Sequence, residues 1–318
     1  MEKKIRDLLD NSNSIAIFFH INPDGDAVGS SLALKFALNQ LNKKDVTVFS
    51  SDKIPENLEF LNKDNSICYT LTNKKFDLGI VLDCNEPKRV GIMEKVLNNC
   101  KNILNIDHHI PSEFFKEYQI INNNASSTCE ILYYFFKDLN IKFNKDICLS
   151  LYTGLATDSG CFMFSITDGL HFIANELVKN IDNVEDLNYY LFRQKGFGEV
   201  ALYGQAINKL ELFCDNRLAI TNLTLSDFEK TGTKLEHTPG IVFSLSGLAN
   251  VDVVCVMSEE KSGVFKIAFR SKTTDVRKLA ILFGGGGHKY ASGCKLYGTK
   301  NAVKNKIISK VKEFLCTE

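Results

Sequence analysis

Short apolar runs alternate with segments of helical periodicity through the first half of the chain. Four runs rich in Val, Ile, Leu and Phe lie at 14–20, 46–50, 76–83 and 103–107. After the first of them, apolar residues recur at helical spacing over 27–41. Continuous apolar runs are typical of strands that are buried on both faces of a parallel sheet. The pattern therefore predicts an α/β domain built on a doubly wound, mainly parallel sheet.

Two helices are expected next, over 126–140 and 144–157. Either Ser126 or Ser127 could cap the first of them, because Glu130 follows Ser127 at the spacing of a capping box. Thr167 is predicted to cap a further helix that ends near residue 180.

The second half of the chain predicts a smaller, mixed α/β domain. A helical segment of mixed charge that contains Gly196 and Gly198 connects it to the first domain. Strands are expected over 218–224, 251–258 and 264–271, with helices over 275–282 and 302–315. We therefore divide the chain into a catalytic domain, a helical connector and a second domain, at 1–185, 186–212 and 213–318.

Composition and charge narrow the class of protein. The 318 residues include 38 basic and 38 acidic side chains, and this balance disfavours a salt-driven binder of long duplex nucleic acid. The ten cysteines lack the paired spacing of a metal ribbon or a disulfide framework. The charged start of the chain is unlike a secretory leader, and no apolar run approaches the ~18 residues of a membrane span. We expect a protein of the reducing cytoplasm.

Acidic and imidazole side chains cluster where the predicted strands and helices end. Ligands of open α/β sheets gather at the carboxyl ends of the strands, so groups from four separate segments could converge on one crevice. Carboxylate oxygens are the preferred ligands of hard divalent cations, which also accept imidazole. Six such groups are enough for two cations that share one carboxylate: His20, Asp24, Asp26, Asp83, His108 and Asp158.

Each of these motifs taken alone has a structural explanation. Asp24 and Asp26 could form an Asx turn, and Asp83 could cap the turn that follows it. The two histidines after Asp107 could be a polar strand end, and Asp158 could simply end a helix. Their joint occurrence at the ends of elements that one sheet can bring together favours the metal site.

A second cluster lies in the glycine run 284–287 and the residues that follow it. Consecutive glycines let main-chain N–H groups approach an anion, and a helix is expected to start after the run. His288 would add positive charge, and Arg270 with Ser271 at the end of the preceding strand could contact a phosphate. The alternative is a flexible loop with a surface arginine.

These motifs resemble those of the DHH phosphoesterase family. The resemblance extends from the first strand to about residue 295, and its motifs occur in the family's order: His20-x-Asn-Pro-Asp24-Gly-Asp26, Asp83, Asp107-His108-His109, Gly154-x-x-x-Asp158-Ser-Gly160 and Gly-Gly-Gly-His288-x-x-Ala-Ser-Gly293. The last motif is similar to the C-terminal substrate domain of that family. The two-domain layout is similar to the family's oligoribonuclease and 3′-phosphoadenosine-5′-phosphate (PAP) phosphatase branch.

The resemblance implies a role for each motif residue. One metal would be held by His20, Asp24 and Asp83, and a second by Asp26, Asp83, His108 and Asp158. Asp107 would orient the histidines, and His109 would contact a substrate phosphate or donate a proton. The family also implies Mn²⁺, although the ligand set admits Mg²⁺ or Co²⁺. Substrate phosphate would be bound by Arg89, Arg270, Ser271, Gly286, Gly287 and His288.

The function expected from this resemblance is the hydrolysis of short RNA oligonucleotides, of PAP, or of both, by water activated between two metals. An alternative in the same class is a phosphodiesterase for cyclic di-AMP or its linear product pApA. A non-catalytic nucleotide sensor and an inorganic pyrophosphatase are weaker alternatives. The expected partner is a short single-stranded RNA or a dinucleotide, and a homodimer is a further expectation.

Overall fold

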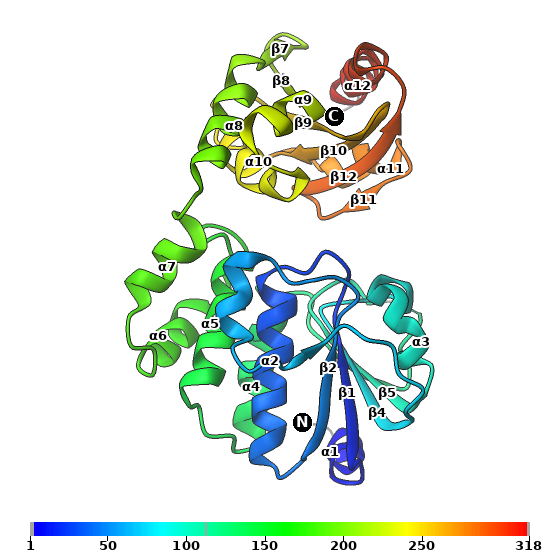
Figure 1. The fold of residues 1–318 in the computed structure, drawn as a ribbon, viewed down its shortest axis with the longest axis vertical. Coiled ribbons are helices and arrows are strands. Elements are labelled where there is room, and N and C mark those ends of the chain that lie inside the picture. Colours follow the sequence, from blue (N-terminus) through cyan, green and yellow to red (C-terminus); the bar gives the residue numbers. More distant parts are fainter. Residues whose placement is uncertain (1–2, 112, 317–318) are drawn as a thin grey trace. The chain divides into compact units, whose positions relative to one another are not determined.

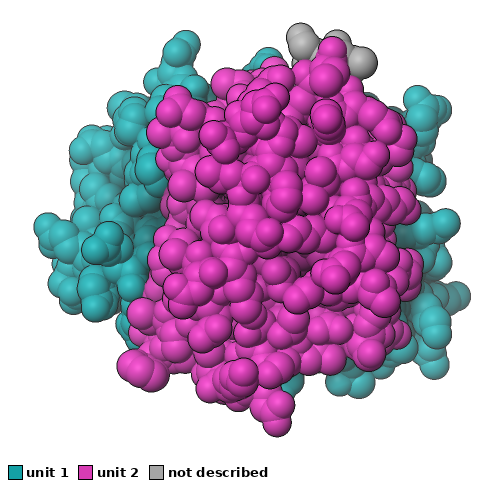
Figure 2. Space-filling view, turned by 90° about the horizontal axis from the view of Figure 1, so that it is seen from above, with its two compact units in different colours: residues 1–194 teal, residues 195–318 magenta. Residues whose placement is uncertain are grey.

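The computed structural model describes residues 3–111 and 113–316 and contains two compact units. Residues 1–194 form the first unit and residues 195–318 the second (Figures 1 and 2). The boundary falls within the segment that we treat above as a connector. Helix α7 (Val184–Phe192) belongs to the first unit, and helix α8 (Phe197–Asn208) belongs to the second.

The first unit is built on a six-stranded sheet in which every strand pair is parallel, in the order β3-β2-β1-β4-β5-β6. Its strands are β1 (Ser14–Phe18), β2 (Asp45–Phe49), β3 (Ile67–Cys68), β4 (Phe76–Leu82), β5 (Cys100–Asp107) and β6 (Tyr118–Ile121). Ile15 and Ile17 pack into the core on one face of the sheet, whereas Ala16 and Phe18 pack into the core on the other. This burial on both faces explains the continuous apolar runs and confirms the predicted fold class.

Helices cover both faces of this sheet (Figure 1). They are α1 (Lys3–Asp10), α2 (Gly25–Gln40), α3 (Glu94–Leu97), α4 (Thr128–Asp138), α5 (Lys145–Asp158) and α6 (Leu170–Val178), with 3₁₀ helices η1 (Glu56–Leu61) and η2 (Pro87–Met93). Helices α2 and α5 approach closely because each carries a glycine at the contact. A Cβ on Gly29 of α2 would lie 2.4 Å from the Ser150 carbonyl oxygen of α5, and one on Gly154 of α5 would lie 3.1 Å from Asp26 Cα of α2.

The capping predictions are confirmed at α4 and wrong at α6. The Glu130 N–H donates to Ser127 Oγ at 3.1 Å, so Ser127 caps α4. Helix α6 begins at Leu170 after Gly169, and Thr167 does not cap it. The Thr167 hydroxyl instead donates to Glu130 Oε1 at 2.8 Å. The hydroxyl that the local sequence predicts to cap a helix is therefore hydrogen-bonded to the buried carboxylate of Glu130.

The second unit is built on a mixed six-stranded sheet in the order β11-β12-β10-β9-β8-β7, in which β8 and β9 are parallel and the other pairs antiparallel. Its remaining elements are β7 (Glu211–Phe213), β8 (Leu218–Leu223), α9 (Leu225–Thr231), η3 (Leu235–His237), α10 (Pro239–Leu245), β9 (Val253–Lys261), β10 (Val264–Arg270), α11 (Val276–Ile281), β11 (Gly286–Gly287), β12 (Ala291–Tyr297) and α12 (Lys300–Leu315). This unit confirms the predicted mixed α/β domain. Within 3–111 and 113–316, no helix has the length and apolar character needed to cross a membrane.

Candidate metal centre

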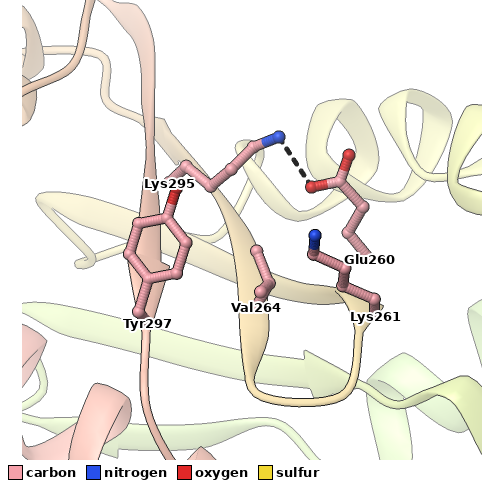
Figure 3. A pocket seen from close by; sticks show the side chains of 5 residues that line it. All are labelled: Glu260, Lys261, Val264, Lys295 and Tyr297. Atoms are coloured by element: carbon pink, nitrogen blue, oxygen red, sulfur yellow. Dashed lines mark ion pairs between the residues drawn. The ribbon is translucent and has the colours of Figure 1, made fainter.

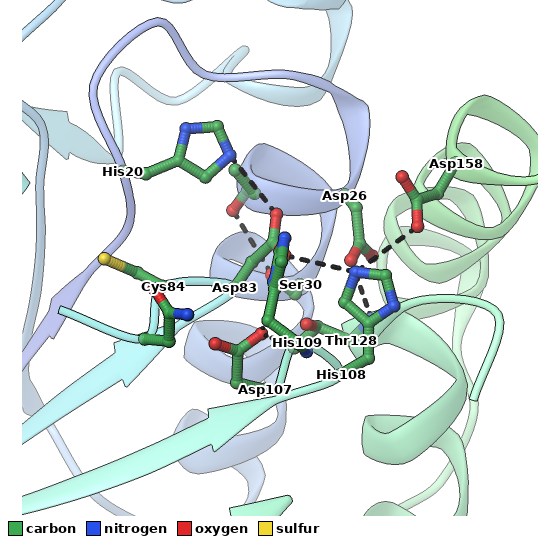
Figure 4. A network of polar contacts seen from close by, with 12 residues as sticks. His20, Asp26, Ser30, Asp83, Cys84, Asp107, His108, His109, Thr128 and Asp158 are labelled. Carbon is green, nitrogen blue, oxygen red and sulfur yellow. Dashed lines mark hydrogen bonds and ion pairs between the residues drawn. The ribbon is translucent and has the colours of Figure 1, made fainter. Parts of the chain in front are cut away.

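The sheet of the first unit brings the predicted acidic and imidazole residues together at its carboxyl edge (Figure 4). Strands β1, β4 and β5 are neighbours. His20 follows β1, Asp83 follows β4, and Asp107 ends β5. Asp26 lies in the first turn of α2, and Asp158 is the last residue of α5. These elements are distant in sequence, and the parallel topology is what places their ends side by side.

His20, Asp24 and Asp83 form a first donor group, in which one ligand atom from each residue lies within 4.8 Å of the others. His20 Nε2 lies 3.3 Å from Asp83 Oδ2 and 3.7 Å from Asp24 Oδ2. The other ring nitrogen, Nδ1, lies 2.8 Å from the carbonyl oxygen of Ile21. Because a carbonyl can only accept, Nδ1 carries a hydrogen, so Nε2, which faces the carboxylates, is the nitrogen that would bind a cation once its own proton is displaced.

Asp26, His108 and Asp158 form a second donor group of the same size. His108 Nε2 lies 3.4 Å from Asp158 Oδ2 and 3.5 Å from Asp83 Oδ1. Its Nδ1 faces the Ala125 carbonyl oxygen at 3.4 Å. The two groups therefore use their imidazoles in the same way, with Nδ1 toward a main-chain carbonyl and Nε2 toward carboxylates.

Asp83 lies between the two groups and presents one oxygen to each of them (Figure 4). Its main chain has a left-handed φ of 53°, which turns the side chain at the end of β4. The side chain is buried, and among the described residues no donor forms a hydrogen bond to its Oδ1. The ring nitrogens of His108 and His109 are near this atom, at 3.5 and 3.4 Å, but form no hydrogen bond to it. Since a buried carboxylate oxygen that accepts no hydrogen bond is costly, it fits a role as a metal ligand.

Asp26 is held by main-chain donors that sequence reasoning missed. Its Oδ2 accepts the Thr128 N–H at 2.7 Å, and its Oδ1 accepts the Cys129 N–H at 2.9 Å. Both N–H groups belong to the first turn of α4, where a negative charge is favoured by the helix dipole. The cap at Ser127 predicted where this helix begins, but main-chain donors carry no side-chain signature, so the sequence gives no signal for the contact itself.

Asp107 orients the second histidine of the triplet. Its Oδ1 accepts the His109 main-chain N–H at 3.0 Å and faces His109 Nδ1 at 2.7 Å. His109 Nδ1 also lies 3.4 Å from Asp83 Oδ1. The pairing with Asp107 assigns a hydrogen to Nδ1 and so fixes the orientation of the ring.

The crowding of carboxylates shifts the acid–base equilibria of the site. Burial lowers the pKa of both imidazoles. Pairing with the Asp83 carboxylate and the negative charge of the other carboxylates outweigh this effect, and they raise the pKa of His20 to about 9 and that of His108 to about 11. Burial, together with the charge of Asp83, raises the pKa of the Asp26 carboxyl above its usual range. Burial and the charge of Asp26 raise the pKa of Asp158 well above its ordinary value. The site therefore attracts positive charge strongly, as expected of a cation site.

Arg89 lies in η2, next to the loop that carries His20. Its carbonyl oxygen accepts the Ile21 N–H at 2.7 Å, so the two segments are joined by their main chains. Gly91, two residues further, has a φ of 64°. A Cβ there would lie 2.6 Å from both Ile21 Cγ2 and Ser51 Oγ, which explains why glycine is needed at this turn.

The remaining predicted substrate residues gather in the second unit, where β10, β11 and β12 meet. Arg270 pairs with Ala291 across β10 and β12, and Gly287 pairs with Ser292 across β11 and β12. The Ser271 N–H donates to the Tyr290 carbonyl at 3.1 Å. Burial lowers the pKa of the Arg270 guanidinium. His288 is exposed in the turn between β11 and β12.

The helix expected to start after the glycine run is absent, and this prediction was wrong. The run leads through β11 into a hairpin with β12, because β12 pairs along its whole length with β10. The N–H groups of Gly284, Gly285 and His288 donate to main-chain carbonyls. These three N–H groups are therefore engaged in hydrogen bonds within the chain and do not form an open anion-binding nest.

A separate small pocket lies at the β9–β10 hairpin and β12 (Figure 3). It has a volume of about 180 Å³ and is lined by Glu260, Lys261, Val264, Lys295 and Tyr297. Lys295 Nζ pairs with Glu260 Oε2 at 2.7 Å, which neutralises both side chains. None of the predicted site residues lines this pocket.

The sequence matches two domain families that correspond to the two units. The DHH family N-terminal domain matches residues 14–155, and the DHHA1 domain matches residues 219–316. Together with the parallel sheet and the Asp-His-His triplet at its edge, these matches show that the chain belongs to the DHH family.

Individual relatives match over nearly the whole chain. The bifunctional oligoribonuclease and PAP phosphatase NrnA of Bacillus subtilis is 25% identical over 310 residues, which is 96% of each chain. The protein of the same name from Thermus thermophilus is 28% identical over 293 residues, covering 89% of this chain and 84% of that one. The crystal structure of an exopolyphosphatase-related protein from Bacteroides fragilis aligns with a TM-score of 0.89 and 27% identity, over 98% of this chain and 96% of that one.

Proposed function

We propose that this protein hydrolyses the phosphoester bonds of short RNA oligonucleotides and of PAP in a metal-dependent reaction. The chain is a phosphoester hydrolase, since the B. subtilis and T. thermophilus relatives, which match most of its length, are named for these two activities. The observation that carries the metal-dependent mechanism is Asp83, whose two oxygens face two separate donor groups. One carboxylate shared between two groups is the arrangement that a two-metal site requires.

The donor groups define which residues would hold each cation. His20, Asp24 and Asp83 would hold one, and the second would be held by Asp26 and Asp83 together with His108 and Asp158. Two bound divalent ions lower the pKa of a water and stabilise the charge of an in-line displacement at phosphorus. We propose Mn²⁺, because the resemblance to the DHH family implies it, whereas the mixed carboxylate and imidazole ligand set also admits Mg²⁺ or Co²⁺.

The chain's own residues perform the remaining steps. Asp107 orients the His109 ring through Nδ1, and the role that we propose for His109 is to contact a phosphate oxygen or to supply a proton to the departing ribose 3′-oxygen. Water is the nucleophile, and its oxygen forms the new bond to phosphorus as the ester bond breaks. No covalent enzyme intermediate is needed.

Phosphate binding is assigned to both units. In the first unit we propose Arg89 as a phosphate contact, because its main chain is hydrogen-bonded to Ile21 in the loop that carries His20. In the second unit we propose that Arg270, Ser271 and His288 bind a substrate phosphate, with Gly286 and Gly287 allowing its close approach. Support comes from the meeting of these residues where β10, β11 and β12 are paired.

The cytoplasm is the compartment that we propose for this reaction. All ten cysteines are free thiols, which suits a reducing environment. The proposed partner is a single-stranded RNA of a few nucleotides, because neutral net charge gives little attraction to long duplexes.

A substrate panel assayed with Mn²⁺ tests the proposal. The panel contains RNA of two to five nucleotides, PAP, pApA and cyclic di-AMP. We expect hydrolysis of short RNA and PAP to be fastest. Fastest cleavage of cyclic di-AMP would instead assign the cyclic dinucleotide function, and binding of all four without turnover would assign a sensor.

A matched pair of variants links turnover to the site. Asp83→Asn removes the shared charge at the carboxyl end of β4. The control, Asp77→Asn, removes a charge near the other end of the same strand, and its amide oxygen can still accept the N–H groups of Asn13 and Ser14. Asp83→Asn should abolish turnover and Asp77→Asn should preserve it. Unchanged turnover in Asp83→Asn would remove this residue from the mechanism.

A further inference from the structure

The segment 125–129 contacts two of the three residues in the second donor group. The Ala125 carbonyl faces His108 Nδ1 at 3.4 Å. The N–H groups of Thr128 and Cys129 donate to the two oxygens of Asp26. The position of this one segment therefore determines where the Asp26 carboxylate and the His108 ring lie.

The buried side chain of Glu130 holds the segment 125–129 in place through a hydrogen bond. Its Oε2 accepts the Ser126 N–H at 2.7 Å. Its Oε1 accepts the Thr167 hydroxyl at 2.8 Å. Thr167 belongs to the loop that follows Asp158, the third residue of the second donor group. Glu130 thus connects the segment that holds Asp26 and His108 to the loop that leaves Asp158.

The first donor group is held by other contacts. His20 Nδ1 faces the Ile21 carbonyl, and Asp24 Oδ1 accepts the N–H groups of Asp26 and Ala27 at 3.1 Å. None of these contacts involves Glu130 or its two partners. A substitution of Glu130 should therefore change the cation affinity of the second donor group and leave that of the first donor group unchanged.

We propose that Glu130 is a positioning residue for the second cation site, formed by Asp26, His108 and Asp158 with the shared Asp83, and that the first site does not depend on it. This inference rests on the proposed function, because it requires both sites to bind cations. Outer partners that orient metal ligands change the affinity for the metal by about 10- to 100-fold when they are removed.

Mn²⁺ titration of the full chain by calorimetry tests the inference. The wild type should bind two ions, and Glu130→Ala should weaken the binding of one of them by about 10- to 100-fold. His20→Ala disables the first site. In that background, Glu130→Ala should lower the affinity for the remaining ion by the same factor. Glu130→Gln should largely restore binding, because the amide oxygen can accept the Ser126 N–H while its NH₂ donates to the Thr167 hydroxyl.

Control variants separate positioning from a loss of fold. Asp227→Ala removes another buried capping carboxylate, which accepts the Thr224 N–H in the second unit, and should leave both affinities unchanged. If Glu130→Ala fails to fold, Thr167→Val tests the inference in its place. It removes one of the two hydrogen bonds to Glu130 and should weaken the binding of the second-site ion alone.

The outcomes are distinguishable. A wild type that binds fewer than two ions contradicts the proposed function, and the inference falls with it. Two ions in the wild type, with unchanged affinities in folded Glu130→Ala or with both ions weakened equally, overturn the inference alone. If Thr167→Val has to decide, wild-type affinities in that variant overturn it too.

Discussion

Gly154→Ala should distort the contact between α2 and α5 on which Asp26 depends. The new Cβ would lie 2.3 Å from Cys129 Sγ, 2.7 Å from Asp26 Oδ1 and 3.1 Å from Asp26 Cα, whereas ordinary contacts begin at 3.4 Å. Relieving these contacts requires α5 to move outward by roughly 1 Å, and overpacking of this kind costs about 1–3 kcal/mol. Alanine returns up to about 1 kcal/mol through its better helix propensity. Because all three contacts are shorter than 3.4 Å, we expect the overpacking cost to be in the upper part of its range, about 2–3 kcal/mol. The net loss in the free energy of unfolding is then about 1–2 kcal/mol.

Thermal unfolding measures this loss. For a unit of this size, each kcal/mol shifts the unfolding temperature by about 2–4 °C, so the first unit of Gly154→Ala should unfold about 2–8 °C lower. Gly204→Ala is the matched control, since it lies inside α8 and its Cβ would meet no atom within 4 Å. That variant should be neutral or more stable. A Gly154→Ala protein as stable as Gly204→Ala would refute the close packing of α2 on α5.

Three further outcomes follow from the site and the second unit. In the metal-free protein His20 and His108, with pKa values of about 9 and 11, are protonated at pH 7.5. Each bound Mn²⁺ should therefore displace at least one proton, with more from the second site because the pKa of Asp158 is also raised, and the affinity should rise at least about tenfold per pH unit below those values. A pH-indicator titration without proton release would contradict this. His109→Ala should lower kcat by about 10²- to 10⁴-fold and retain two Mn²⁺ ions, and the loss of an ion would show that His109 is a ligand. Gly285→Ala should lower the unfolding temperature of the second unit, because its Cβ would lie 2.1 Å from the Gly293 carbonyl oxygen. Gly286→Ala, whose Cβ would meet no atom within 4 Å, should not lower it. Equal unfolding temperatures for the two variants would argue against the β11–β12 hairpin.

The sheet of the first unit was predictable because burial on both faces leaves a continuous apolar run. That signal marks β1, β2, β4 and β5, but it is missing from the two-residue β3 and from the half-exposed edge strand β6. In the second unit, β12 forms through pairing with β10, which is a tertiary effect with no local signature. The glycine run therefore suggested a loop and a helix where the chain forms a hairpin.

The candidate site was predictable to the extent that side chains define it. His20, Asp83 and Asp158 stand at the ends of elements, and the strand-end rule brings such groups together. The contacts that orient them were not predictable, because they come from main-chain groups such as the Thr128 N–H. Thr167 illustrates the same limit, since a residue suited to cap a helix instead binds a buried carboxylate.

Anomalous diffraction from crystals grown with Mn²⁺ tests the central claim most directly. We expect two manganese peaks, each bound by one oxygen of Asp83, with His20 among the ligands of one ion and His108 among those of the other. A single peak, or manganese bound away from Asp83, would contradict the account.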